Sequence, residues 1–404
     1  MVRPERRTTT DLLVAAAIAV VIATAAALIW WTSDARAALS RPAAEPLPPA
    51  TPARAVPTAL HQLWTAASPA TARPVAVAGT VATGAGHEVI GRDPNTGEPR
   101  WSYARDNDLC AVSWVYHFVV AVYRDDRGCG QVSSLNASTG RRGPTRTSYA
   151  DAQVSVSSDG MTVLSAGDTR LELWRSDLVR TLAYGEIDAR VKPAARGLHS
   201  GCLLASAAAS SSAAAVLEAC PEHAELRLTL LRPGKEDDEP EQRYVSGLGV
   251  EADSGARALA VSDTNTAVYL PSPQPKVEVI DQTGTTVAST LLPRPPLLST
   301  AVSRPGDLVT WWTGDAVLVF DSTDLTYRYT IGADGPNVPI GPGAMMAGRL
   351  LVPVTSGIGV YDPTTGTLDR FLPVDRLPVN SAVVPAVLGT HVLEQRGDTV
   401  VALG

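Results

Sequence analysis

The segment that decides the fold is EVIGRDPNTGEPRWSY, which runs from Glu88 to Tyr103. In it, an apolar stretch is followed by Asp93, by the pair Thr96-Gly97, and then by a second stretch that contains Trp101. An Asp or Asn side chain accepts hydrogen bonds from the backbone amides of a turn, and Gly adopts the positive φ that tight turns need. The segment therefore predicts two antiparallel strands joined by a short turn.

The same unit recurs six times along the chain, with varying fidelity. Copies begin at Gln131, Leu171, Leu226, Val277, Val317 and Ile358. Their turn residues are Asn136, Thr139, Gly140, Asp281, Gly284, Asp321, Asp362, Thr365 and Gly366, with Arg175 and Arg232 at this place in two degenerate copies. Consecutive turns lie about 40 residues apart, and two further short apolar runs lie between them. Four short strands in a unit of this length are typical of a β-propeller blade.

The two ends of the chain predict how the propeller closes. The C-terminus supplies three strands of a last blade and stops before a fourth. Residues 59–68 supply the missing strand, since Trp64 stands where Trp101 stands in the first unit. We therefore expect an all-β fold over residues 59–404, an eight-bladed propeller of four-stranded antiparallel blades. Seven blades is the alternative if one degenerate copy is miscounted.

The segment from Asp93 to Trp101 resembles the repeat of pyrroloquinoline-quinone (PQQ)-like β-propellers, in which the Trp docks against the neighbouring blade. Phe371 is a candidate for the same role in the seventh unit, one place out of register. The resemblance covers about residues 59–404 and implies the fold. Its family includes quinoprotein dehydrogenases and also non-catalytic scaffolds, such as an outer-membrane assembly lipoprotein with eight blades. The preference for Arg over Lys resembles actinobacterial usage.

The N-terminus predicts a membrane anchor. Residues 1–11 carry three arginines, and residues 12–31 form an uncharged run that is long enough to span a bilayer as a helix. Basic residues before the run predict a cytoplasmic tail over 1–11 and an extracytoplasmic remainder. The alternative is a signal peptide cleaved near Ala37, which would release a secreted protein. The proline content of residues 32–58 predicts an extended linker that adds nothing to a core.

The four cysteines predict two disulfides on the oxidising side of the membrane. The run CLLASAAASSSAAAVLEAC, from Cys202 to Cys220, favours a helix or a flexible tether by composition. The repeat requires two strands there, so we expect a hairpin that turns at residues 210–212 and places Cys202 opposite Cys220. Cys110 and Cys129 form the second expected pair, with Cys129 in the loop between the second and third strands of its blade.

Nothing in the sequence identifies a reaction. The net charge of −7 disfavours a nucleic-acid partner, the vicinal cysteine pair of quinoproteins is absent, and the histidines lack metal-ligand spacing. We expect the acidic run 236–241 to be solvated, and the pairs Trp114/Tyr116 and Trp311/Trp312 to pack in the core.

The leading hypothesis is a non-catalytic scaffold without cofactor or metal. Residues 12–31 would hold it in the cell membrane, and a propeller face would bind an envelope protein or cell-wall component. A quinoprotein-like oxidoreductase and a ligand-sensing module are the alternatives.

Overall fold

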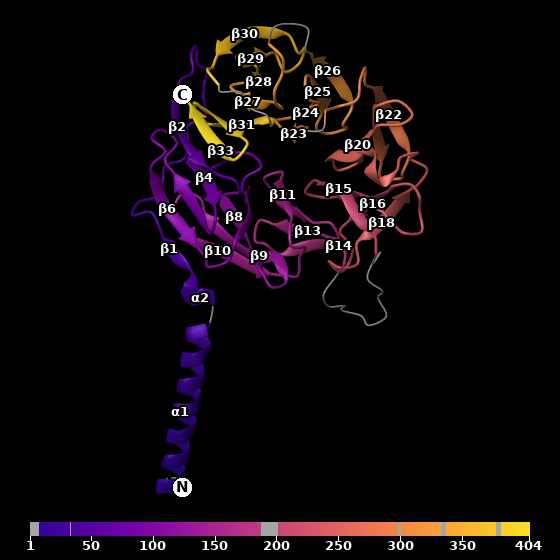
Figure 1. Ribbon diagram of the computed structural model, residues 1–404. Coiled ribbons are helices and arrows are strands. Elements are labelled where there is room, and N and C mark those ends of the chain that lie inside the picture. The colour runs from indigo at the N-terminus through magenta and orange to yellow at the C-terminus, as the bar shows by residue number, and fades with distance from the viewer. Residues whose placement is uncertain (1–7, 33, 187–200, 298–299, 333–336, 377–380) are drawn as a thin grey trace, which may run out of the picture.

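Eight antiparallel sheets are arranged in a ring in the computed structural model, which describes residues 8–32, 34–186, 201–297, 300–332, 337–376 and 381–404 (Figure 1). Seven of the sheets have four strands, and the first has a fifth strand at its outer edge. The eight-bladed propeller expected from the repeat is confirmed, and the seven-bladed alternative is wrong.

Each blade runs from its innermost to its outermost strand in chain order, apart from the eighth, whose outermost strand comes from the N-terminal part of the chain. Blade 1 contains β3 (Val75–Val77), β4 (Thr80–Ala85), β5 (Glu88–Arg92) and β6 (Pro99–Ala104), and blade 2 contains β7 (Leu109–Val115), β8 (Phe118–Asp125), β9 (Gly128–Asn136) and β10 (Arg142–Thr147). Blade 3 contains β11 (Ser155–Ser158), β12 (Thr162–Ala166), β13 (Arg170–Arg175) and β14 (Arg180–Gly185), and blade 4 contains β15 (Leu203–Ala209), β16 (Ala214–Ala219), β17 (Arg227–Arg232) and β18 (Glu241–Val245). Blade 5 contains β19 (Arg257–Val261), β20 (Asn265–Leu270), β21 (Lys276–Asp281) and β22 (Thr286–Leu291), and blade 6 contains β23 (Ala301–Ser303), β24 (Leu308–Trp312), β25 (Val317–Asp321) and β26 (Tyr327–Ile331). Blade 7 contains β27 (Ala344–Met346), β28 (Arg349–Val354), β29 (Gly357–Tyr361) and β30 (Leu368–Pro373), and blade 8 contains β31 (Val383–Leu388), β32 (His391–Arg396), β33 (Thr399–Leu403) and β2 (Gln62–Ala67).

The strands differ in apolar character according to their place in the blade. Every side chain of β12 and all but the last of β13 are buried, because neighbouring blades cover both faces of these middle strands. Such strands read as continuous apolar runs. The outermost strand β22 has only exposed and half-buried residues. The alternation of apolar runs with turns in the sequence follows from this difference.

The apolar core is divided among the interfaces between blades. In the described part of the chain, eight clusters of buried residues each join two consecutive blades around the ring, including blade 8 with blade 1. The cluster between blades 8 and 1 brings Trp64 and Val400 against Val81. Because each blade buries its faces against its neighbours, closing the ring removes the last exposed faces.

The N-terminal strand closes the ring as expected. β2 pairs antiparallel with β33, with Thr65 opposite Val401. This pairing supplies the outermost strand of blade 8 and covers an edge that would otherwise be open. The backbone of His61 also exchanges hydrogen bonds with that of Gly404, at 2.9 and 3.0 Å.

Among the described residues, one helix is long and apolar enough to cross a membrane, α1 (Thr9–Thr32). Its first turn is capped reciprocally, since Asp11 accepts hydrogen bonds from the backbone and hydroxyl of Thr8 and donates its own N–H to that hydroxyl. A short helix, α2 (Asp34–Ala37), follows, and its Arg36 stacks on Trp31 at 4.0 Å. Residues 1–7, most of the expected cytoplasmic tail, lie outside the described residues.

The proline-rich segment before the propeller differs from the expected linker. β1 (Leu39–Arg41) pairs with β6, the outermost strand of blade 1. Leu47 and Val56 are buried, and Leu47 N donates to Ser138 O at 2.9 Å. The isolated apolar residues of this segment pack on the surface of the propeller. The segment is therefore part of the folded domain and contributes to its core.

Candidate functional site

The predicted turn residues cap the turns between the third and fourth strands of their blades. Asp93 Oδ1 accepts backbone hydrogen bonds from Asn95 and Thr96 at 2.9 and 3.4 Å. Asn136 Oδ1 accepts one from Thr139 N at 3.1 Å. Carboxylate acceptors in the same position are Asp281, Asp321 and Asp362, with positive φ at Gly284, Leu325 and Gly366, and Thr365 N is one of the donors to Asp362. These contacts are local and give the turns a structural explanation.

Two of the turns also receive a tryptophan from the preceding blade. Trp101 Nε1 donates to Ala137 O at 2.7 Å, and Trp64 Nε1 donates to Pro94 O at 2.9 Å. Gly140 lies beneath Trp101, where a Cβ would come within 2.6 Å of the side chain. Glycine is thus needed at this turn both for its φ of 70° and for the close approach of the indole.

Other residues take the place of Trp in later blades. In blade 6, Tyr329 donates its hydroxyl hydrogen to Pro363 O at 2.7 Å. In blade 7, the equivalent position of β30 holds Arg370, whose guanidinium donates to Val56 O at 2.5 Å. Phe371, the expected substitute, is the next residue along and is half-buried. The position that holds Trp101 in blade 1 therefore also donates a hydrogen bond to a neighbouring segment in blades 6 and 7. In blade 7, the acceptor belongs to the N-terminal segment.

Disulfides join Cys110 to Cys129 and Cys202 to Cys220, the two pairs expected from the sequence. The second pair flanks the hairpin of β15 and β16, which turns at Ser210. The position of Cys129 differs from the expectation, because it is the second residue of β9 and not part of the preceding loop. The register of β8 and β9 shifts near this end, and the glycines beside Cys129 do not prevent strand pairing.

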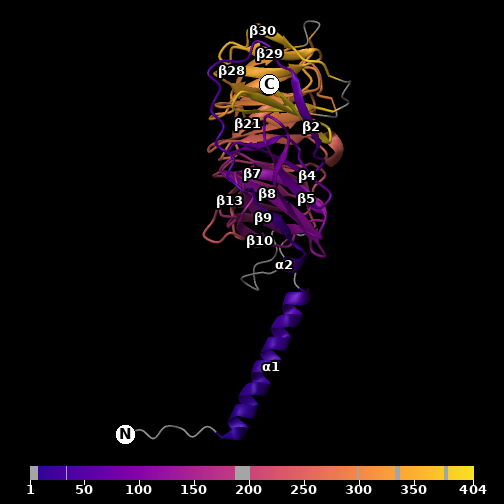
Figure 2. The ribbon, with the colours of Figure 1, turned by 90° about the vertical axis from the view of Figure 1, so that its left-hand side faces the viewer.

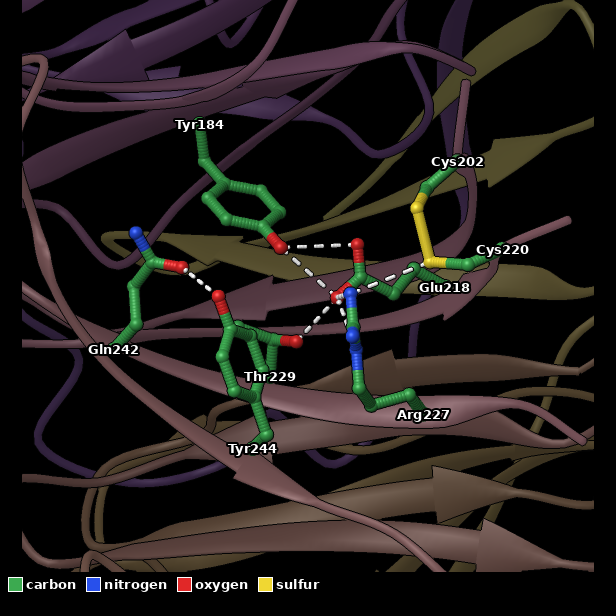
Figure 3. The surroundings of a disulfide bond; sticks show 8 residues. All are labelled: Tyr184, Cys202, Glu218, Cys220, Arg227, Thr229, Gln242 and Tyr244. Carbon is green, nitrogen blue, oxygen red and sulfur yellow. Dashed lines mark hydrogen bonds and ion pairs between the residues drawn. A yellow bond between two sulfur atoms is a disulfide. The ribbon is translucent and has the colours of Figure 1, made fainter. Parts of the chain in front are cut away.

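A buried carboxylate lies beside the second disulfide (Figure 3). Glu218, on β16, has no exposed surface and accepts hydrogen bonds from the Tyr184 hydroxyl at 2.9 Å and from Arg227 at 3.0 Å. The Thr229 hydroxyl donates to it as well. Burial and the neighbouring carboxylate raise the pKa of Tyr184, so the tyrosine stays a neutral donor.

This cluster is suited to structure and not to metal binding. Cys202, Cys220 and Glu218 lie close together, but sulfurs that are bonded to each other cannot act as thiolate ligands. Arg227 supplies the compensating charge and also stacks over the Tyr244 ring at 4.4 Å. The hydrogen-bonded ion pair lets blade 4 keep a charge in its interior.

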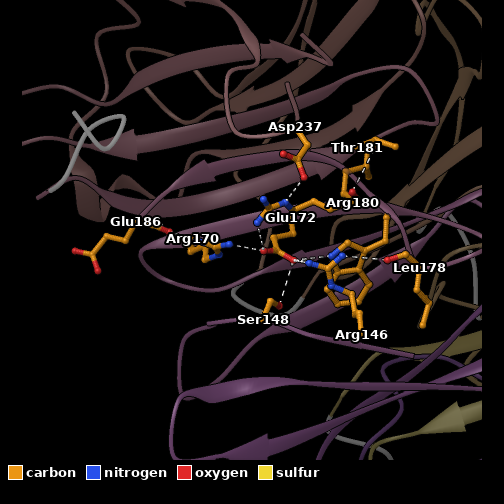
Figure 4. Close-up of polar contacts among 11 residues, drawn as sticks. Arg146, Ser148, Arg170, Glu172, Leu178, Arg180, Thr181, Glu186 and Asp237 are labelled. Atoms are coloured by element: carbon orange, nitrogen blue, oxygen red, sulfur yellow. Dashed lines mark hydrogen bonds and ion pairs between the residues drawn. The ribbon is translucent and has the colours of Figure 1, made fainter. Parts of the chain in front are cut away.

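A second buried carboxylate, Glu172 on β13, is surrounded by arginines (Figure 4). Arg146 Nη2 lies 2.9 Å from it, Arg170 forms a closer ion pair, and Arg180 Nη1 lies at 3.3 Å. Burial raises the pKa of Glu172, but the arginines outweigh burial and hold the pKa below its ordinary value. Because Arg146 belongs to β10, the cluster joins blades 2 and 3.

The acidic run was expected to be solvated, and this is wrong for two of its members. Asp237 Oδ2 lies 2.7 Å from Arg180 Nε, and Asp238 is buried. The ion pair between Asp237 and Arg180 extends the Glu172 cluster into blade 4. A second acid is favourable there because three arginines surround the single carboxylate of Glu172.

Glu172 and Glu218 belong to no motif that points to a site. The available signal was a single acid inside an apolar run, LELW and AVLEA, which indicates a buried, paired carboxylate.

An aromatic patch is exposed on the turns of blades 2 and 3. We define the aromatic patch as Trp114, Tyr116, His117, Phe118 and Met161. Tyr116 and Met161 are 62% and 61% exposed, and the other three are half-buried. The expectation of core packing is therefore wrong for Tyr116, whereas Trp114 does pack against the core between blades 1 and 2. The Tyr116 and His117 rings are 4.9 Å apart, and those of His117 and Phe118 are 4.1 Å apart.

The patch is held rigidly. Tyr116 occupies the turn between β7 and β8 with a φ of 53°, and its N–H donates to Gly160 O at 2.7 Å, in the corresponding turn of blade 3. This bond brings Tyr116 next to Met161. By contrast, Trp311 and Trp312 are buried, as expected. The aromatic patch therefore presents two exposed apolar side chains, Tyr116 and Met161, on adjacent turns that are joined by a backbone hydrogen bond.

Comparison with known proteins adds support for the fold. No family model matches the sequence, and no curated protein is detectably similar to it. Among solved structures, Sqt1 of Saccharomyces cerevisiae is 10% identical over 87% of this chain and 98% of that chain, with a TM-score of 0.52. The computationally designed Ika8 protein is 15% identical over 89% and 99%, with a TM-score of 0.51. BamB from Moraxella catarrhalis is 14% identical over 85% and 99%, with a TM-score of 0.48. The similarities to Sqt1 and to Ika8 concern the fold alone.

Proposed function

We propose that the protein is a membrane-anchored, extracytoplasmic scaffold that binds a protein of the cell envelope and is not an enzyme. The observation that carries this proposal is the aromatic patch. Tyr116 and Met161 expose most of their apolar surface on adjacent turns, and burying such surface against a partner is favourable. Rigid turns lose little conformational entropy on binding, which further favours association.

The way the chain leaves the propeller supports the same proposal. β1 ties the N-terminal segment to the outermost strand of blade 1, so α1 leaves from the rim of the ring (Figures 1 and 2). A propeller attached to a membrane at its rim keeps the turns of both faces accessible from the side. The arginines before α1 favour a cytoplasmic N-terminus, and the two disulfides favour an oxidising compartment for the propeller.

We also infer that the blades are of the PQQ-like type and serve here as a frame. The docking of Trp64 and Trp101 on the following turns supports this inference. A non-catalytic role is supported by the two buried carboxylates, because Glu172 and Glu218 are both engaged by arginines within the protein.

Affinity capture from detergent-solubilised native membranes tests the proposal. The full-length wild type is compared with the double variant Tyr116→Ala/Met161→Ala, and captured proteins are quantified by mass spectrometry. Val287→Ala/Leu291→Ala is the matched control, since Val287 and Leu291 are 52% and 63% exposed on the distant strand β22. We expect the patch variant to lose specific envelope proteins that the control retains. Identical captured sets for all three proteins would contradict the proposal.

A further inference from the structure

The innermost strands of the blades surround a cavity at the centre of the ring. Its volume is about 500 Å³, and strands β7, β11, β15, β19 and β23 contribute to its lining. Small side chains keep it open, among them Ala207 and Ala208 of the hairpin β15–β16, together with Ser113 and Ser157. The volume is in the range of small-molecule sites.

Two arginines from different parts of the chain lie in this cavity. Arg73 comes from the segment before β3 and donates to Val302 O, on blade 6, at 2.8 Å. Arg304 follows β23 and donates to Val261 O, on blade 5, at 2.6 Å. Each guanidinium therefore reaches another blade and is held by a backbone carbonyl.

Neither arginine is neutralised by an ion pair within the described part of the chain. Among the described residues that line the cavity, Asp159 is the single acid, against the two arginines. Its Oδ1 accepts hydrogen bonds from the backbone of Met161 and Thr162, at 2.9 and 2.7 Å. The lining therefore has an excess of positive charge.

The pKa values of both arginines lie below their ordinary value. Burial lowers the pKa of Arg73, and the charge of Arg304 lowers it further. Burial also lowers the pKa of Arg304, while Asp159 opposes this effect. Two like charges at the centre of a folded domain, with one acid beside them, are stabilised when an anion binds between them.

We propose that the central cavity binds a small oxyanion, the carboxylate or phosphate group of a small molecule, between Arg73 and Arg304. A guanidinium presents five N–H donors in a planar fork that matches such groups, and a single nitrogen of each arginine is engaged by backbone carbonyls. Ser113 and Ser157 line the same cavity. Their backbones pair with β8 and β12, whereas their hydroxyls make no hydrogen bond within the described part of the chain and are available to the ligand. This site borders the aromatic patch through the bond between Asp159 and Met161, but it does not depend on a protein partner.

Isothermal titration of the full chain in detergent tests this proposal, with inorganic phosphate and citrate as probes and chloride at equal ionic strength as the reference. We expect saturable binding of at least one probe. Loss of a charge-assisted hydrogen bond predicts that Arg73→Gln and Arg304→Gln bind about 10- to 100-fold more weakly. Tighter binding of citrate indicates a carboxylate ligand, and tighter binding of phosphate indicates a phosphorylated one.

The matched control is Arg175→Gln, because Arg175 is an exposed arginine that pairs with Asp177 in a turn. It should bind the probes like the wild type. Arg304→Lys retains the cation but not the fork and should bind with intermediate affinity, which serves as the second variant if Arg304→Gln does not fold by circular dichroism. No saturable binding to the wild type, or equal affinity in the cavity variants and Arg175→Gln, would overturn the proposal.

Discussion

Replacement of Trp101 by alanine is predicted to lower the free energy of unfolding by about 3–5 kcal/mol. Trp101 is 2% exposed, and a buried aromatic side chain removes about 150–250 Å² from water. At about 25 cal/mol per Å², this area corresponds to roughly 4–6 kcal/mol, of which alanine retains part. Trp101→Phe should cost about 1–2 kcal/mol. It removes the bond to Ala137 O, but that oxygen still accepts from the Thr80 hydroxyl at 2.7 Å.

The assay is urea denaturation of the full chain in detergent, followed by far-ultraviolet circular dichroism so that the lost indole does not alter the signal. Tyr116→Ala is the aromatic control, because its side chain is 62% exposed, and it should change stability by no more than about 0.5 kcal/mol. Equal losses for Trp101→Ala and Tyr116→Ala would refute the claim that indole docking joins blades 1 and 2. If the unfolding free energy of Trp101→Ala alone depended less steeply on urea concentration, the blades would separate before global unfolding.

Three further predictions concern the buried charges, a disulfide and the N-terminal segment. The arginines that hold the pKa of Glu172 below its ordinary value stabilise the fold above the unfolded pKa of about 4.3, and this contribution is lost as pH falls toward the native pKa. Urea denaturation over acidic pH should therefore show a steeper loss for the wild type than for Glu172→Gln, and parallel curves would contradict the ion-pair account. Cys202→Ser/Cys220→Ser removes a crosslink between residues 18 apart and should lower the unfolding free energy by about 3 kcal/mol without reductant; an unchanged denaturation midpoint would count against this. Leu47→Ala should cost about 2–3 kcal/mol, since Leu47 is 4% exposed, and wild-type stability would show that the N-terminal segment does not pack on the propeller.

The architecture could be predicted because its signals are local and repeated. Asp93 and Gly97 mark a turn whose partners lie within a few residues, so each copy can be recognised without knowing what packs on it. The hairpin between Cys202 and Cys220 followed from the repeat, although alanine favours a helix. There, burial of β16 between neighbouring strands outweighs local preference.

The parts that could not be predicted depend on contacts between distant residues. Leu47 is an isolated apolar residue among prolines, and no periodicity indicates that it is buried against the propeller. Tyr116 is exposed because β7 ends at Val115 and Tyr116 lies in the two-residue turn before β8. Arg73 and Arg304 share a cavity because the ring closes, and neither has a sequence pattern of its own.

Photo-crosslinking in intact cells tests the central claim most directly. A benzophenone amino acid replaces Tyr116 in the aromatic patch or, as the control, Leu291, whose exposure of 63% is nearly the same as the 62% of Tyr116. After irradiation, adducts of the full-length protein are detected by gel shift and identified by mass spectrometry. The account predicts a discrete adduct with an envelope protein from position 116 and none from position 291. The same adducts from both positions, or no adduct from position 116, would contradict it.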